Sequence, residues 1–331
     1  MVRLFFLFII MWLPAMSMAA ETVAPIVLIY ETGGKKTDNS FVDMARKGAE
    51  QARQELGLEY EEHVLKRNET REDVFRRYAA AKAELIIALG FQNVATVVKI
   101  ADDYPATSFT VIDGMIPPTF SNVQSVVFRD NEGAFLVGVI AAMHSKSKKI
   151  GFIGGMDVPV IRDFAYGFQQ GAQYINKDIE VMREMVGTTR DAWSNPKKAA
   201  QLTQKQIAQG ADVVFAAAGG SSIGTLEKAA EYKDVYSIGV DFNQNGLFPG
   251  SVLTSLVKRV DKVVYNAIKQ RGDNSWKSGV QYKGISEGAL DYAVDENNRK
   301  VLSPQSIDEV ERVKDYIMRG VIKVSNYRAK P

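Results

Sequence analysis

Short runs of β-branched and aromatic residues alternate with longer amphipathic stretches along most of the chain, and this alternation constrains the fold more than any other feature. Apolar runs that alternate with amphipathic helices pack as parallel strands, with the helices covering the faces of the sheet. In the first part of the chain the predicted strands are 25–30, 62–65, 85–89, 108–112 and 123–128, and the predicted helices are 41–56, 71–83 and 94–102. We therefore expect an α/β fold with a doubly wound parallel sheet.

The same alternation begins again after residue 128. The predicted strands of this second series are 149–153, 180–186, 211–217, 235–240 and 251–256, and the predicted helices are 132–144, 160–175, 197–209 and 223–231. Because each series can build a sheet of its own, the two series predict two lobes.

The last part of the chain breaks this pattern. Its predicted elements are a helix at 261–271, short strands at 280–285 and 290–294, and a helix at 306–319 with Ser306 and Glu309 as a capping box. Segments that cross between two lobes form the hinges of a closing clamp. We expect a first lobe of residues 21–127 and 256–288, and a second lobe of residues 128–255 and 289–331.

The amino terminus has the pattern of an export signal. Arg3 precedes an apolar run at 4–13, and small residues surround a cleavage site after residue 20. The run is too short to span a bilayer. Because the sequence contains no cysteine that could carry a lipid, we expect residues 1–20 to be removed and the product to be periplasmic, soluble and not lipid-anchored. We also expect a monomer.

Composition argues against several classes of function. The absence of cysteine removes thiol nucleophiles and thiolate metal sites, and the two histidines, His63 and His144, have no partner at metal-ligand spacing. We therefore expect no metal, no cofactor and no catalytic residue. The formal net charge is only +2 and charges of both signs are interspersed, so the sequence gives no indication of nucleic-acid binding.

A G-x-S-x-G pattern lies at 220–224, between a predicted strand and a predicted helix. This is the context of a hydrolase nucleophile, but in that fold the histidine follows the serine. Both histidines precede Ser222. We interpret the glycines, beginning with Gly219, as a tight turn whose amide groups face a crevice.

Charged residues follow two successive predicted strands of the second series. Asp241 comes after 235–240, and Lys258 comes after 251–256. Ligands of open α/β sheets bind beyond the carboxyl ends of the strands. The two side chains are therefore candidates for ligand binding, and an ordinary ion pair at two strand ends is the alternative.

Further candidates lie at comparable places in the first series. Asp113 ends the predicted strand 108–112, and Asp38 precedes the first helix. Phe41 begins that helix, and Trp193 lies in a loop of the second series. Rings from two lobes can enclose a flat ligand, and carboxylates accept hydrogen bonds from hydroxyl and ring N–H groups. This combination suits a sugar that carries a heteroaromatic base, with packing of each ring as the alternative.

The order of these motifs resembles the basic membrane protein family of bacterial substrate-binding proteins, whose characterised members include purine nucleoside receptors of ABC importers. The resemblance covers nearly the whole chain after residue 20. The segments that carry it are 38–41, 109–113, 131–138, 149–155, 164–168, 210–215, 238–241 and 253–258. It implies a type I periplasmic-binding-protein fold, in which hinge crossovers join two lobes and the ligand lies between them.

The resemblance also implies roles for individual residues. In nucleoside-binding relatives, aromatic residues at the positions of Phe41 and Trp193 enclose the base. Asp38, with its neighbour Asn39, and Asp113 correspond to residues near the base. Asp241 and Lys258, with the backbone near Gly219, correspond to residues that hold the ribose. Val42, Trp193 and Asn195 depart from the residues common in the family, which puts the identity of the base in doubt.

The function that these expectations favour is the binding component of an ABC importer, which captures a purine nucleoside-like solute and delivers it to a permease in the inner membrane. Three alternatives stay open. The ligand could be another stacked heteroaromatic compound such as riboflavin. The chain could be a secreted nucleoside hydrolase in which Asp38 and Asp113 activate water, or it could serve a membrane sensor in place of an importer.

Overall fold

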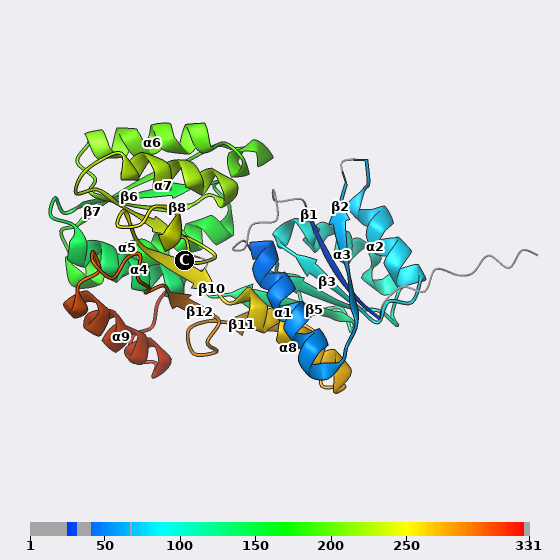
Figure 1. The fold of residues 1–331 in the computed structure, drawn as a ribbon. Helices are drawn as coiled ribbons and strands as arrows, with labels where there is room; N and C mark the ends of the chain where they lie inside the picture. The colour runs from blue at the N-terminus through cyan, green and yellow to red at the C-terminus, as the bar shows by residue number, and fades with distance from the viewer. Residues whose placement is uncertain (1–24, 32–40, 67, 328–331) are drawn as a thin grey trace, which may run out of the picture.

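The computed structural model describes residues 25–31, 41–66 and 68–327. The predicted leader and the candidate residues Asp38 and Asn39 lie outside these residues. The chain forms two α/β lobes that lie side by side, with the amino-terminal segments in one lobe and the middle of the chain in the other (Figure 1). Segments from the last part of the chain belong to both lobes, so the chain crosses between them more than once.

The first lobe contains a six-stranded sheet in the order β11-β5-β4-β3-β1-β2, and all of its strand pairs are parallel. Its strands are β1 (Ile26–Glu31), β2 (Tyr60–Leu65), β3 (Leu85–Leu89), β4 (Ser108–Ile112), β5 (Val123–Phe128) and β11 (Gly279–Lys283). Its helices are α1 (Phe41–Leu56), α2 (Arg71–Ala80), α3 (Val94–Ile100) and α8 (Val260–Gly272).

The first strand shows why the strands are apolar throughout. Ile26, Leu28 and Tyr30 of β1 pack in the core cluster that contains α1 and α8. Val27 and Ile29 point to the opposite face and pack in the cluster that contains α2 and α3. Because helices cover both faces of the sheet, the side chains on both faces of the strand are buried, as is usual for parallel sheets.

The second lobe repeats this plan with the strand order β12-β10-β9-β8-β6-β7. Its strands are β6 (Lys149–Gly154), β7 (Glu180–Met185), β8 (Val213–Ala217), β9 (Tyr236–Gly239), β10 (Val252–Lys258) and β12 (Leu290–Tyr292). Its helices are α4 (Asp130–His144), α5 (Pro159–Ile175), α6 (Pro196–Ala208), α7 (Ser222–Ala230) and α9 (Pro304–Met318). β12 is antiparallel to β10, and the remaining pairs are parallel. The predicted fold class is confirmed.

Glycines let α4 and α5 approach closely beneath the second sheet. A Cβ atom at Gly138 would collide with the carbonyl oxygen of Phe168, and one at Gly171 would collide with that of Phe135. The two helices belong to the core cluster that extends through both lobes. α4 therefore joins the hinge to a tightly packed core.

The chain passes between the sheets at three places: from β5 into α4, from β10 into α8, and from β11 to β12. The division into lobes at residues 127, 255 and 288 stays a prediction. Within the described residues, none of the helices is both long enough and apolar enough to cross a membrane.

The structure tests two predicted local features, the capping box of the last helix and the turn at Ser222. The predicted capping box of the last helix is wrong, because Ser303 is the N-cap and its side chain accepts a hydrogen bond from the backbone N–H of Ser306. Pro304, which suits the first helical position, starts the helix earlier, and Glu309 contacts Arg312. The hydroxyl group of Ser222 is buried and accepts a hydrogen bond from the N–H of Ala218, as a turn serine does.

Short 3₁₀ helices lie among the loops of both lobes. They are η1 (Phe91–Asn93), η2 (Ala101–Asp103), η3 (Arg190–Trp193), η4 (Gly219–Ser221) and η5 (Asn245–Leu247). η1 follows β3, η3 follows β7 and η4 follows β8. These three turns therefore lie beyond the carboxyl ends of strands, where ligands of α/β sheets bind.

Candidate ligand site between the two sheets

Two aspartates occupy equivalent positions in the two lobes. Asp113 follows β4, and Asp241 lies just beyond β9, which has the same place in the second sheet. Both residues have a left-handed backbone, with φ angles of 63° and 69°. Residues other than glycine adopt this conformation at a cost, and such residues gather at functional sites. The repeated conformation supports a functional role for both carboxylates.

Lys258 connects these acids. It ends β10, and its side chain is only 1% exposed. Its Nζ atom donates a hydrogen bond of 2.9 Å to Asp113 and lies 3.0 Å from Oδ1 of Asp130, the first residue of α4. Lys258 belongs to the second sheet and Asp113 follows a strand of the first. This ion pair therefore links the two lobes.

Aromatic rings surround the same ammonium group. Its Nζ atom lies 4.6 Å from the ring centre of Phe128, 5.5 Å from that of Phe164 and 6.0 Å from that of Phe41. A cation within about 6 Å of a ring face is attracted by the ring, and the attraction grows when water is excluded. These contacts, together with the nearby carboxyl groups, help to keep the buried lysine charged.

Three carboxyl groups lie around this one cation, and burial raises the pKa of two of them. Burial raises the pKa of Asp130 to about 8, because the loss of hydration outweighs the attraction of the Lys258 ammonium. Burial also raises the pKa of Asp241, against the same ammonium. Burial alone would lower the pKa of Lys258, but the surrounding carboxylates raise it above its ordinary value. The cluster therefore keeps the lysine charged, whereas burial makes Asp130 and Asp241 weaker acids than exposed aspartates.

Asp130 is not among the residues that the sequence pattern predicted. It is 3% exposed, and its Oδ1 atom has no hydrogen-bond partner of proper geometry although Lys258 is close. The signal that could have found it is an acid at the beginning of a helix that is buried along most of its length. A charge in such a position requires a partner.

Trp193 lies at the end of η3 and rests against glycines of the second lobe. A Cβ atom at Gly155 would collide with its indole ring, and a Cβ atom at Gly219 would lie 3.4 Å from Cε3 of the ring. The ring of Phe91, from η1 of the first lobe, lies edge-on to the indole with 6.3 Å between the ring centres. The lobes therefore also meet through an aromatic pair, with one ring from each lobe.

The structure brings the predicted residues together in two groups. The first group surrounds the ammonium group of Lys258, which contacts Phe41 and Asp113. The charge of Asp241 also raises the pKa of Lys258. Trp193 and Gly219 form the second group. The ring that lies against Trp193 belongs to Phe91, a residue that the sequence-based argument did not select.

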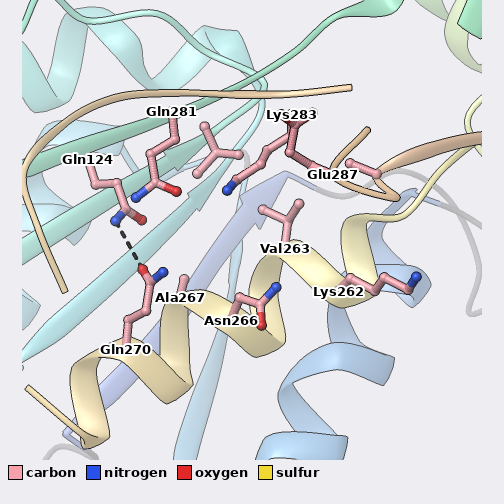
Figure 2. A pocket seen from close by; sticks show the side chains of 11 residues that line it. Gln124, Lys262, Val263, Asn266, Ala267, Gln270, Gln281, Lys283 and Glu287 are labelled. Carbon is pink, nitrogen blue, oxygen red and sulfur yellow. Dashed lines mark hydrogen bonds between the residues drawn. The ribbon is translucent and has the colours of Figure 1, made fainter. Parts of the chain in front are cut away.

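A separate cavity lies in the first lobe between α8 and two strands, β11 at the edge of the sheet and its neighbour β5 (Figure 2). Polar side chains line most of it, among them Gln124, Asn266, Gln270 and Gln281. Its volume of about 60 Å³ is well below the roughly 300–1,000 Å³ of pockets that hold small molecules. This cavity is therefore too small for a ring system with a sugar.

The chemistry of the site between the sheets is that of recognition. Carboxylate and ammonium groups can bind hydroxyl groups, and aromatic rings can stack on a flat ligand. Among residues 25–31, 41–66 and 68–327, we find no group of three or more histidine, aspartate or glutamate side chains that could hold a metal ion.

Comparisons with known proteins agree with this arrangement. A family model described as ABC transporter substrate-binding protein, PnrA-like, matches residues 26–327. Basic membrane protein D of Borreliella burgdorferi is 31% identical over 313 residues, which cover 92% of this chain and 88% of that protein. An uncharacterised lipoprotein of Pyrococcus furiosus is 32% identical over 280 residues, covering 81% of this chain and 69% of that protein.

A solved structure extends the likeness to three dimensions. The crystal structure of an ABC transporter system solute-binding protein from Aeropyrum pernix has 29% sequence identity and a TM-score of 0.78. The match covers 90% of this chain and 92% of that chain. The likeness includes both lobes, because it extends over nearly all of each chain.

The expectation of a periplasmic, soluble protein without a lipid anchor is wrong in the light of these relatives. Three Pyrococcus proteins are named lipoproteins, and the Borreliella relative is named a basic membrane protein. The expectation rested on the absence of cysteine from one sequence. The absence of one residue type does not determine where a protein is located, and the names of the relatives indicate attachment to a membrane.

The family model and the arrangement of the two sheets indicate the same family. The family model covers more than nine tenths of the chain, and two doubly wound sheets with three crossings are the architecture of type I periplasmic binding proteins. The chain therefore belongs to the PnrA-like family of ABC transporter substrate-binding proteins.

Proposed function

We propose that this protein binds a purine nucleoside-like solute between its two sheets and delivers it to an ABC permease. The observation that carries this proposal is the position of Lys258, a fully buried cation from one lobe that is paired with Asp113 of the other. Rings from both lobes, Phe41 and Phe164, lie within 6.0 Å of its ammonium group. A nucleoside combines the two kinds of group that such a site recognises, hydroxyl groups and a flat base.

In this proposal the polar groups hold the ribose. Asp241 and Lys258 bind its hydroxyl groups, and a backbone amide near Gly219 adds a hydrogen bond. Phe41 and Trp193 enclose the base, and Asp38, Asn39 and Asp113 bind its polar edge. The left-handed backbone of Asp113 and Asp241 supports this assignment, because such strain is retained where a side chain must point in one direction.

Binding and release depend on the relative position of the lobes. A ligand shifts the population toward the closed form only by contacts that it makes better in that form than in the open one. Contacts with side chains from both sheets meet this requirement. The permease then distinguishes the closed form from the open one, and the protein acts as a monomer without a cofactor.

The ligand assignment is tested by calorimetry. The purified protein is unfolded, washed free of bound solute and refolded, and inosine, guanosine, adenosine and riboflavin are titrated into it. We expect binding of at least one purine nucleoside, with quenching of Trp193 fluorescence. Binding of riboflavin alone would select the flavin alternative. If none of the four compounds binds, the ligand assignment is wrong, although the family is not.

A substitution tests the assignment of the ribose. Asp241→Ala should weaken binding of ribonucleosides by roughly 10- to 100-fold, the loss that follows removal of a charged hydrogen-bond partner. Deoxyribonucleosides should be affected less. Asp261→Ala is the matched control, because Asp261 pairs with Arg259 at the start of α8. Equal losses for ribosides and deoxyribosides would place Asp241 outside the ribose site.

The hydrolase alternative has its own measurement. Incubation of the refolded protein with inosine or guanosine, followed by chromatography of the products, detects release of the free base. We expect the nucleoside to be recovered intact. Release of base that is abolished by Asp113→Asn would favour the hydrolase.

A further inference from the structure

Phe91 is an aromatic residue in an unusual position. Its side chain is 43% exposed, although large aromatic rings are generally buried. The contact that the ring makes is with Trp193 of the other lobe, at 6.3 Å between ring centres and an interplanar angle of 61°. Edge-to-face pairs at this separation are attractive beyond the area that they bury.

The turn that carries Phe91 is fixed to the first sheet. Gly90 has a φ angle of 95°, which a residue with a side chain rarely adopts, and its N–H donates to the carbonyl oxygen of Ile112 at 2.8 Å. The side chain of Asn93 donates to the carbonyl oxygen of Leu89 at 2.7 Å. Phe91 therefore moves with the first lobe.

The turn that carries Trp193 is fixed to the second sheet. The N–H of Asn195 donates to the hydroxyl oxygen of Ser221 at 2.7 Å, and that hydroxyl group donates to the carbonyl oxygen of Ala192 at 2.7 Å. The indole ring packs so closely on Gly155 that a Cβ atom there would collide with it. Trp193 therefore moves with the second lobe, and its contact with Phe91 exists only while the lobes are together.

We propose that Phe91 and Trp193 form an aromatic latch between the lobes that slows the release of a bound ligand. Phe41, the other aromatic candidate of the first lobe, lies near the ammonium group of Lys258 and has a different role. The inference rests on the proposed function, because the latch retains a ligand that lies between the sheets. Opening the lobes breaks the contact between the rings before the ligand can leave.

The test uses inosine as the probe and measures its dissociation rate by stopped-flow displacement. Phe91→Ala should raise the dissociation rate roughly 3- to 10-fold, the range expected for loss of one aromatic pair, with little change in the association rate. Phe120→Ala is the matched control, because that ring packs against the outer core of the first lobe. An unchanged dissociation rate in Phe91→Ala would overturn the latch.

A double-mutant cycle separates the latch from direct contact with the ligand. Trp193→Ala should raise the dissociation rate, and adding Phe91→Ala to it should have less than a two-fold further effect, because the partner of Phe91 is already absent. Fully additive effects would show that Phe91 does not act through Trp193, and this result too would overturn the latch.

A fluorescence measurement made with and without inosine distinguishes failure of the latch from failure of the proposed function. The chain has three tryptophans, so Trp12→Phe and Trp276→Phe leave Trp193 as the reporter. In this background Phe91→Ala should shift the emission to longer wavelength and increase quenching by acrylamide, because the ring that covers the indole is lost. The effect should be larger with saturating inosine, because the closed form holds the two rings together. Unchanged emission and quenching in protein that binds inosine would overturn the latch, whereas failure of inosine to bind, in Phe91→Ala and its parent alike, would overturn only the nucleoside assignment.

Discussion

The crossing from β5 into α4 and the crossing from β10 into α8 have the same backbone conformation but side chains of opposite charge. β5 ends at Phe128 and β10 ends at Lys258, and in both cases an arginine precedes the helix that follows. Arg129 has φ and ψ angles of −84° and 66°, and Arg259 has angles of −82° and 61°. The repeated geometry suits a hinge in which both segments bend together.

The side chains beside these arginines differ. The first crossing carries an aromatic ring at Phe128 and a buried acid at Asp130, and the second carries a buried cation at Lys258 and an apolar residue at Val260. Lys258 contacts both residues of the first crossing, at 4.6 Å to the ring centre and 3.0 Å to the carboxylate. The two crossings thus share a backbone conformation, and the side chains that differ between them form the charged cluster.

The third crossing holds the other two together. The N–H of Arg129 donates to the carbonyl oxygen of Lys283 at 2.9 Å, and the N–H of Arg259 donates to that of Ala289 at 2.8 Å. These acceptors lie at the two ends of the segment between β11 and β12. The backbone of the hinge is therefore symmetric, whereas its charges are not.

The largest effect is expected from removing the cation. Lys258→Met keeps much of the apolar length of the side chain but leaves three carboxyl groups without their shared partner. We expect the free energy of unfolding at pH 7 to fall by about 3 to 5 kcal/mol, as when one partner of a buried ion pair is lost. Urea titration monitored by circular dichroism measures this loss.

Lys262→Met is the control for this substitution, because Lys262 is an exposed lysine one turn into α8. Its free energy of unfolding should lie within about 0.5 kcal/mol of the wild type. If Lys258→Met also lowered the free energy of unfolding by less than about 1 kcal/mol, the buried cation of the second crossing would not stabilise the protein as proposed.

The second effect concerns pH and the acid of the first crossing. Folding raises the pKa of Asp130 from 3.8 to about 8. Between pH 4 and pH 8, therefore, Asp130 keeps a proton in the folded protein that it has released in the unfolded chain. Stability is therefore highest at the acid end of the range and falls as the pH rises toward 8, by at most about 1.4 kcal/mol per pH unit from this residue. Asp130→Asn should remove this contribution.

Urea titrations at several pH values between 4 and 8 compare the slopes. Asn131→Ala serves as the control, because it removes a hydrogen bond of 3.0 Å to the carbonyl oxygen of Val324 but no titrating group. It should lower stability without changing the slope. A slope that is the same in Asp130→Asn and in the wild type would contradict the raised pKa.

The smallest effect is expected at the arginines that the crossings share. Arg129 lies 3.3 Å from Glu287 and Arg259 lies 2.7 Å from Asp261, and both arginine side chains are more than one third exposed. Exposed ion pairs contribute little, so Arg129→Gln and Arg259→Gln should each cost less than about 1 kcal/mol in urea titrations. A loss above about 2 kcal/mol in one variant alone would show that the backbone symmetry hides an energetic difference.

Most elements of the fold could be predicted from the sequence, because buried parallel strands and amphipathic helices have distinct patterns. The first helix was predicted with the bounds Phe41–Leu56 that the structure shows. The capping box at Ser306 was wrong because two serines compete for the same helix start, and Pro304 favours the earlier one. Local patterns identify elements better than they identify ends.

The candidate site was predictable only in part. Asp113, Asp241 and Lys258 were recognisable because they follow apolar strands, and strand ends of one sheet meet at one edge. Asp130 was missed because it begins a helix and gives no signal as a strand-end residue. Phe91 was missed because its partner, Trp193, lies about one hundred residues away in another lobe, and no local pattern records such a contact.

The sequence by itself determined the two series of strands and helices and the acids that follow the strands, because both follow from the period and polarity of neighbouring residues. Only the tertiary structure decided which side chains share a cation and which ring faces Trp193. These contacts depend on how the three crossings set one lobe against the other. The physical reason is that an ion pair or a ring contact depends on distance in space, which is independent of separation along the chain.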